Sequence, residues 1–156
     1  MRIGVFSDTH GDTYALKKAI EKTGEADLLI HLGDYCRDAE SVSKELKREI
    51  ICVKGNCDFN PYVKTDKIIT VEGKRILLTH GHKYSVKYDY TDICFKAIEE
   101  KVDAVFFGHT HFAEAFEKDN ILFLNPGSLS LPKGDAETYA VVTIDSGLIV
   151  PSIQEL

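Results

Sequence analysis

Residues 2–10 have the sequence Arg-Ile-Gly-Val-Phe-Ser-Asp-Thr-His, an apolar run that passes directly into a carboxylate and an imidazole. Two further short runs rich in Ile, Val and Leu follow, at residues 28–32 and 50–53. Such runs are typical of strands covered on both faces. Between them, Thr13–Thr23 and residues 39–47 have helical spacing, and the aspartate before the first can cap it. The order strand, helix, strand, helix, strand predicts a parallel α/β start with right-handed crossovers.

The second half of the chain has a different pattern. Residues 68–71 and Lys74–Thr79 flank Glu72-Gly73, which is a two-residue hairpin signal. A helix is predicted over residues 90–100. Four further apolar runs predict strands joined mostly by tight polar turns: residues 102–107, 112–117, 121–124 and 139–144. We therefore expect a mainly antiparallel second half and an α/β fold of two sheets packed face to face with helices on the outside.

The bulk composition favours a single domain over residues 1–156. The chain has 156 residues, of which 44% are hydrophobic, and this suits one domain with a substantial core. The N-terminal run meets a carboxylate too early for a signal peptide, and no run approaches the roughly 20 apolar residues that cross a bilayer. We therefore expect a cytoplasmic protein without membrane contact, whose four cysteines are free thiols.

The net charge of −6 comes from acidic residues that are spread along the chain. This is unlike the basic stripe of a nucleic-acid binder, and a long polyanion would be repelled unless something local reversed the sign. Bound metal ions could do that. We expect no long nucleic acid as partner, and a homo-oligomer is an open alternative.

The strongest signal is a pattern repeated at the ends of five predicted strands. Each apolar run passes into residues that can bind a metal ion. The five segments are Phe6-Ser7-Asp8-Thr9-His10, Leu32-Gly33-Asp34, Lys54-Gly55-Asn56, Leu78-Thr79-His80 and Phe107-Gly108-His109-Thr110-His111. Sites in α/β sheets form beyond the carboxyl ends of strands, so these residues can converge. The glycines directly before Asp34, Asn56 and His109 predict tight turns that aim the next side chain across the crevice.

Clustering distinguishes these residues from isolated structural ones. A lone histidine is typical of a structural residue, as we expect for His31 between its apolar neighbours. Five of the six histidines, however, fall in three short motifs. Two carboxylates, one amide oxygen and four imidazoles suit Mn, Fe, Zn or Ni better than calcium. Seven ligands are too many for one open catalytic ion, and they suit two ions about 3.5–4 Å apart with one carboxylate bridging.

With these motifs the sequence resembles the calcineurin-like metallophosphoesterase superfamily, and within it the small bacterial and archaeal phosphodiesterases related to the retromer subunit. The motifs that carry the resemblance occur in the expected order between residues 8 and 128. They are Asp-Thr-His, Gly-Asp, Gly-Asn-Cys-Asp, His-Gly-His, Gly-His-Thr-His and Asn-Pro-Gly-Ser. The fold that the resemblance implies, two mixed sheets sandwiched between helices, agrees with the pattern of elements above.

The resemblance also implies a ligand set and a reaction. One metal ion would be bound by Asp8, His10 and His111, the other by Asn56, His80 and His109, and Asp34 would bridge them. We expect two divalent ions, Mn first, with Ni, Fe or Zn as alternatives. The implied reaction is attack by a metal-bridging hydroxide on the phosphorus of a small phosphodiester, without a covalent enzyme intermediate.

The candidate catalytic residues are Asn56, Cys57 and His82. Asn56 would donate an amide hydrogen bond to a phosphoryl oxygen. Cys57 replaces a histidine that larger members of the superfamily carry as proton donor, and a thiol is a poor substitute at neutral pH. His82 contacts substrate or orients a ligand through a hydrogen bond. Two neighbouring residues also have two possible roles each: Arg37 binds a phosphate or, as we favour, forms a surface ion pair, and Asp58 supports a ligand or, as we favour, caps a turn.

These observations predict a two-metal phosphodiesterase. The alternative is a retromer-subunit-like interaction scaffold on the same fold, in which apolar surface would matter instead of catalysis. A metal-dependent nuclease would use the same chemistry. A small acidic chain, however, has little surface with which to bind a long nucleic-acid strand. The complete set of seven ligands favours the enzyme.

Overall fold

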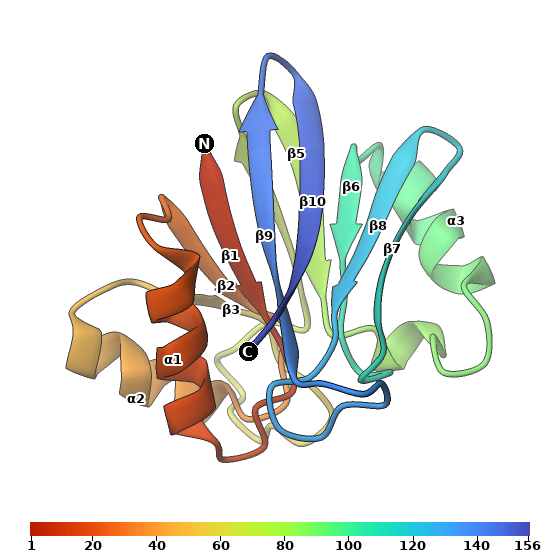
Figure 1. Ribbon diagram of the computed structural model, residues 1–156. Helices are drawn as coiled ribbons and strands as arrows, with labels where there is room; N and C mark the ends of the chain where they lie inside the picture. The colour runs from red at the N-terminus through yellow and green to blue at the C-terminus, as the bar shows by residue number, and fades with distance from the viewer.

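The computed structural model describes all 156 residues, which form two five-stranded sheets and three α-helices. The first sheet contains, from edge to edge, β10 (Leu148–Glu155), β9 (Thr138–Asp145), β1 (Arg2–Phe6), β2 (Leu28–His31) and β3 (Ile51–Cys52). The second contains β4 (Asp66–Val71), β5 (Lys74–Thr79), β6 (Ala104–Phe106), β8 (Ile121–Pro126) and β7 (Ala113–Lys118). Helices α1 (Thr13–Thr23) and α2 (Cys36–Leu46) lie beside the first sheet and α3 (Thr91–Glu100) beside the second (Figure 1).

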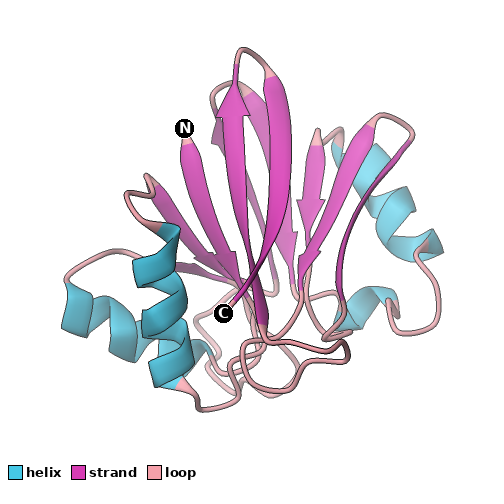
Figure 2. Ribbon diagram, in the orientation of Figure 1, coloured by secondary structure: helices cyan, strands magenta, loops and turns pink.

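The predicted fold class is confirmed, because the two mixed sheets pack face to face between the helices (Figure 2). Alternate strand residues such as Val5 and Leu78 belong to one buried cluster that draws on both sheets. The intervening residues, such as Phe6 and Leu77, pack in two outer clusters that contain residues of α1 and α3. The central strands β1, β2, β5, β6 and β8 are therefore buried on both faces, which explains their unbroken apolar runs.

Two elements differ from the prediction. Helix α2 begins at Cys36, three residues before the predicted start, because the Asp58 carboxylate accepts the Cys36 N–H at 2.7 Å. A cap that comes from a distant loop leaves no local signal. Strand β10 was missed altogether. It contains Pro151 and several polar residues, which an edge strand tolerates, and it pairs with β9 along its whole length.

The expectation of a mainly antiparallel second half is wrong for the centre of the second sheet, where β5, β6 and β8 are parallel. Helix α3 connects β5 to β6 as a crossover, and the β7–β8 hairpin returns so that β8 lies beside β6. The hairpins β4–β5 and β9–β10 are antiparallel. The remaining boundaries agree with the prediction within two residues.

The parallel strands end together at the lower edge of both sheets in Figure 1, where the connecting loops gather. Helix α1 begins at this edge, and the Asp12 carboxylate accepts the Ala15 N–H at 2.8 Å as a cap. No helix is both long and apolar enough to span a bilayer. The four cysteines are free, and the thiols of Cys36 and Cys52 lie 2.7 Å apart between α2 and β3.

Candidate metal centre

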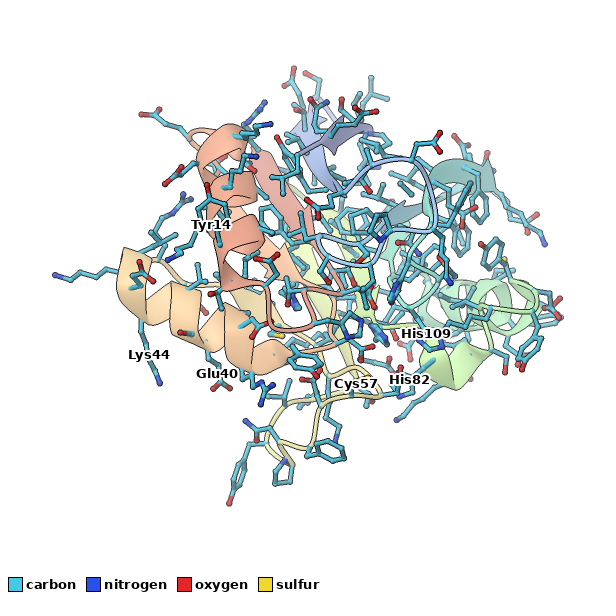
Figure 3. The ribbon with its side chains drawn as sticks, turned by 60° about the horizontal axis from the view of Figure 1, so that its bottom comes forward. Tyr14, Glu40, Lys44, Cys57, His82 and His109 are labelled. Carbon is cyan, nitrogen blue, oxygen red and sulfur yellow. The ribbon has the colours of Figure 1, made fainter.

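The candidate site lies where the carboxyl ends of β1, β2, β5 and β6 meet, on the side that comes forward in Figure 3. The structure brings six of the seven predicted ligands together in two groups, and within each group the ligand atoms lie within 4.8 Å of one another. The first group contains Asp8, His10, Asp34 and His111, and the second contains Asp34, His80 and His109. Asp34 is the member that both groups share.

The two carboxylate oxygens of Asp34 face different histidines. Its Oδ2 lies 3.7 Å from Nε2 of His10, and its Oδ1 lies 3.4 Å from Nε2 of His80. The backbone N–H of Cys57 donates to the same Oδ1 at 2.9 Å, which fixes the carboxylate plane. Asp34 is thus placed to bind one ion with each oxygen.

Asp8 is fully buried among imidazoles. Its Oδ1 lies 3.0 Å from Nε2 of His111, 3.8 Å from Nε2 of His10 and 3.9 Å from Nε2 of His80. Burial acts to raise the pKa of Asp8, but the histidines outweigh it and hold this pKa below its usual range. The same balance lowers the pKa of Asp34, chiefly through His80. Both carboxylates are therefore anionic at neutral pH.

Backbone carbonyls orient two of the imidazoles. Nδ1 of His80 donates to the Leu32 carbonyl at 2.8 Å, and Nδ1 of His111 donates to the Leu131 carbonyl at 2.7 Å. Each bond occupies Nδ1 and leaves Nε2 directed at the carboxylates, as a metal ligand requires. Burial and the nearby His80 lower the pKa of His109 to about 4, so the His109 ring is neutral at neutral pH.

Two buried atoms at the centre have no hydrogen-bond partner: Oδ1 of Asp8 and Nε2 of His80. An unpaired buried polar atom costs about 1–3 kcal/mol, so two of them converging is unusual. A cation between them would satisfy both. Carboxylate and imidazole donors are those that Mn, Fe, Ni and Zn accept. The residues present therefore fit divalent metal ions.

Backbone strain concentrates at the same residues. Five of the seven predicted ligands have left-handed backbone conformations, with φ between 44° and 71°: Asp8, His10, Asp34, His109 and His111. This conformation is uncommon for residues with a Cβ, and it persists only where the surroundings impose it. Such clustering is characteristic of functional sites, and no sequence pattern revealed it.

The three glycines before ligand residues have two different roles. Gly33 has φ +99° and makes the predicted tight turn. Gly55 and Gly108 do not have positive φ, but the predicted tight turns are present, because the Gly55 carbonyl accepts the Asp58 N–H at 3.4 Å and the Gly108 carbonyl accepts the Thr110 N–H at 2.9 Å. A Cβ at Gly55 would collide with Oδ1 of Asp34, and one at Gly108 with Oγ of Ser7. These two glycines are required for the close approach of the strand ends.

Several positioning residues were missed or only partly anticipated. The Asp38 carboxylate accepts the Thr9 hydroxyl at 2.7 Å and the Gly11 N–H at 2.8 Å, which fixes the loop that carries the first two ligands. Ser128, in the Asn-Pro-Gly-Ser motif, donates to the Asp8 carbonyl at 2.8 Å. Asn125 of the same motif donates to the Gly108 carbonyl at 3.0 Å. Of these residues, only Asn125 and Ser128 belonged to a motif that the sequence had singled out.

The three candidate catalytic residues lie at the rim of the two groups. Asn56 is exposed, and its amide forms a hydrogen bond with the Cys57 thiol at 3.5 Å but with neither group. Burial, followed by the charge of Asp34, raises the pKa of Cys57 to about 11. The ring of His82 lies 5.5 Å from that of His80 and 6.1 Å from that of His109, and burial lowers its pKa. Its side chain forms no hydrogen bond with a ligand.

Three polar side chains near the ligands have structural roles. Asp58 acts as a cap, as favoured, but at the start of α2 and not at the turn that follows it, because its carboxylate accepts the N–H groups of Cys36 and Gly55. The surface ion pair predicted for Arg37 is wrong, because its guanidinium lies over the ring of Tyr35 at 4.5 Å and forms no ion pair. His31 is fully buried, and its Nδ1 accepts the Gly33 N–H at 3.2 Å, which is the structural role expected.

Comparison with known proteins agrees with this geometry. A probable metallophosphoesterase of Bacillus subtilis, YsnB, is 34% identical over 148 residues, which cover 94% of this chain and 86% of the relative. The phosphodiesterase YfcE of Escherichia coli is 26% identical, covering 98% and 97% of the two chains. A predicted phosphoesterase of Streptococcus pneumoniae has a TM-score of 0.85 at 30% identity, covering 99% of this chain and 88% of its own.

A more distant structure shares the fold. Vps29 of Entamoeba histolytica in complex with zinc has a TM-score of 0.78 at 20% identity, with 99% of each chain covered. The family model of the calcineurin-like phosphoesterase superfamily domain matches residues 1–147, nearly the whole chain. On this match the chain belongs to the calcineurin-like phosphoesterase superfamily.

Proposed function

We propose that this chain is a two-metal phosphodiesterase that hydrolyses a small phosphodiester. The observation that carries the proposal is the position of Asp34, whose two oxygens face histidines of two different ligand groups. The unpaired buried atoms of Asp8 and His80 support it, because a cation would satisfy both. We propose two divalent ions, Mn first, with Ni, Fe or Zn as alternatives.

The ligands divide between the two proposed ions. Asp8, His10 and His111 bind the first, Asn56, His80 and His109 bind the second, and Asp34 bridges them. Bound ions would supply a hydroxide nucleophile at neutral pH and positive charge for the phosphoryl oxygens. Asn56 lies beside Cys57, whose N–H binds Asp34, and its exposed amide donates to a phosphoryl oxygen. His82 packs on two ligand rings and limits their rotation.

The scaffold alternative is supported by the fold that the chain shares with Vps29. The six ligands that converge, five of them in strained backbone conformations, support the enzyme instead. Turnover distinguishes the two. The protein, loaded separately with Mn, Ni, Fe and Zn, is assayed on a panel of phosphodiesters and monoesters. We expect hydrolysis of diesters with Mn. Stoichiometric metal binding without turnover of any ester would contradict the enzyme and favour the scaffold.

The variant Cys57→His is expected to raise monoesterase activity relative to diesterase activity by about 10-fold or more. A monoester gains most from a group that protonates the leaving oxygen, and a positioned donor contributes about 10²–10⁴-fold. The Cys57 thiol, hydrogen-bonded to the Asn56 amide, is a poor donor. Matched aryl monoester and diester substrates give the ratio, with metal content checked in both proteins. Cys57→Ser is the control. If the ratio of monoesterase to diesterase activity were unchanged in Cys57→His at equal metal loading, Cys57 would have no role in the specificity.

Metal occupancy is expected to fall between about pH 8 and about pH 5, the range in which histidine commonly titrates. The proposed set includes four imidazoles, and a protonated imidazole cannot bind metal, so acid competes directly with the ions. Equilibrium dialysis followed by elemental analysis at each pH measures the occupancy. Circular dichroism checks that the protein stays folded. Occupancy unchanged at the acid end would count against four imidazole ligands.

A further inference from the structure

A cavity of about 310 Å³ opens beside the candidate metal centre, between the start of α2 and the loop of residues 57–60. Its lining includes Tyr35, Arg37 and Glu40 on one side and Cys57, Phe59 and Asn60 on the other. In Figure 3, Cys57 lies close to His82 and His109, whereas Glu40 lies further out along α2. This volume is at the lower end of the range typical of small-molecule sites, about 300–1,000 Å³.

Two lining residues connect this cavity to the metal centre. The backbone N–H of Cys57 donates to the shared carboxylate of Asp34 at 2.9 Å. The ring of Tyr35, the residue that follows Asp34, lies 5.3 Å from the ring of His10. A group attached to a phosphate at the centre can therefore enter the cavity directly. None of the residues that form the cavity's outer part belongs to the ligand set.

The lining combines aromatic faces with a free cation. Phe59 is 91% exposed, so its ring face is open to a ligand. Arg37 stacks on Tyr35 at 4.5 Å and takes part in none of the salt bridges of the molecule. Its planar guanidinium has five N–H donors. A planar ring with hydrogen-bond acceptors on its edge complements both features.

The acidic groups near Arg37 are already engaged. The Asp58 carboxylate accepts the N–H groups of Cys36 at 2.7 Å and Gly55 at 2.9 Å. Glu40, on the next turn of α2, accepts the side-chain amide of Asn60 at 3.4 Å. Arg37 is the one cation in the lining of this cavity, and its N–H donors are not taken up by these carboxylates, which favours a ligand edge rich in acceptor atoms.

We infer that this cavity binds the second substituent of the phosphodiester and that it selects a nucleoside, so that the substrate class is a small nucleotidyl ester. The inference rests on the proposed phosphodiesterase function and deepens it. The base stacks against Phe59, as bases do on exposed aromatic side chains, and its acceptor edge receives the N–H donors of Arg37. A long strand is disfavoured by the net charge of −6.

The test compares two esters that release the same group. Thymidine 5′-(p-nitrophenyl phosphate) and methyl p-nitrophenyl phosphate both yield p-nitrophenolate, so they differ only in the second substituent. With the Mn-loaded protein, we expect kcat/KM at least about 10-fold higher for the thymidine ester, mainly through KM. Arg37→Ala and Phe59→Ala are each expected to lower this preference by about 10-fold. Calorimetric titration of the Zn-loaded protein with thymidine 5′-monophosphate should show the same loss of affinity.

The controls are matched in chemistry and position. Tyr14→Ala removes an exposed aromatic ring from α1, and Lys44→Ala removes an exposed cation from α2 beyond the cavity (Figure 3). Both should keep the wild-type preference. Equal kcat/KM for the two esters in the wild type, or an unchanged preference in both cavity variants, would overturn the inference. If the wild type hydrolysed neither ester with any metal, the proposed function itself would fail, and this is seen before any variant is made.

Discussion

Removal of divalent metal is expected to abolish phosphoester hydrolysis, and addition of Mn²⁺ is expected to restore it. No side chain at the site is activated as a nucleophile. The Cys57 thiol has an amide as hydrogen-bond partner, and the Ser128 hydroxyl donates to the Asp8 carbonyl, so neither has the adjacent base that such catalysis needs. The Ser7 hydroxyl donates to the Asp8 carboxylate but is fully buried, so it cannot reach a substrate. Water is a weak nucleophile at neutral pH unless a metal ion lowers its pKa from 15.7 to about 7.

The experiment removes the ions with a chelator, separates the chelator from the protein and measures metal content before each assay. Activity should follow metal content and return on titration with Mn²⁺. Circular dichroism provides the control, because a fold lost on chelation would also abolish activity. We expect the fold to persist, since the three apolar clusters of the core include residues of both sheets and of the helices and contain none of the metal ligands. Full activity in an exhaustively metal-free sample would rule the mechanism out.

The general position of this site followed from the sequence because it depends on strand ends. Short apolar runs terminate in Asp8, Asp34, His80 and His109, and the carboxyl ends of parallel strands share one edge. That rule needs neither the strand order nor the register. It placed the ligands together even though the second half of the chain was expected to be mainly antiparallel, and β5, β6 and β8 are parallel.

Features that depend on contacts between residues far apart in the chain could not be predicted from the sequence. The start of α2 at Cys36 is set by the Asp58 carboxylate, 22 residues away in the chain. Asp38 lies on the same helix and has no local feature that marks it, yet it binds the loop between β1 and α1. The cation–π contact of Arg37 requires Tyr35 in its left-handed conformation. Each of these depends on tertiary structure that no local pattern encodes.

The assignment of Asn56 remains a prediction. Its side chain is exposed and points to the Cys57 thiol. Carboxylates and imidazoles are drawn together by charge and by their bonds to the backbone, as His80 and Asp34 show. A neutral amide on an exposed loop has no such attraction without a cation.

The variant Asp34→Asn is expected to lose both metal ions and to reduce activity by more than about 100-fold, the upper range for disturbing residues that only support a ligand. The substitution keeps the shape of the side chain but leaves one oxygen. That oxygen satisfies the Cys57 N–H at the Oδ1 position. The amide nitrogen then replaces Oδ2, 3.7 Å from His10, and it presents two N–H donors where a cation would bind.

The reverse orientation of the new amide is no better, because its NH₂ group would then face the N–H of Cys57, donor against donor. In either orientation, one ligand group loses the Asp34 oxygen that would bind its ion. The other group keeps an oxygen, but this oxygen no longer carries negative charge. Asp38→Asn is the matched control, since Asp38 is also a buried carboxylate but accepts only from Thr9 and Gly11 through one oxygen. It should retain both ions, and His82→Ala should retain more activity than Asp34→Asn. Elemental analysis and the diester assay on the same preparations decide the matter: wild-type metal content and rate in Asp34→Asn would show that Asp34 does not bridge two ions.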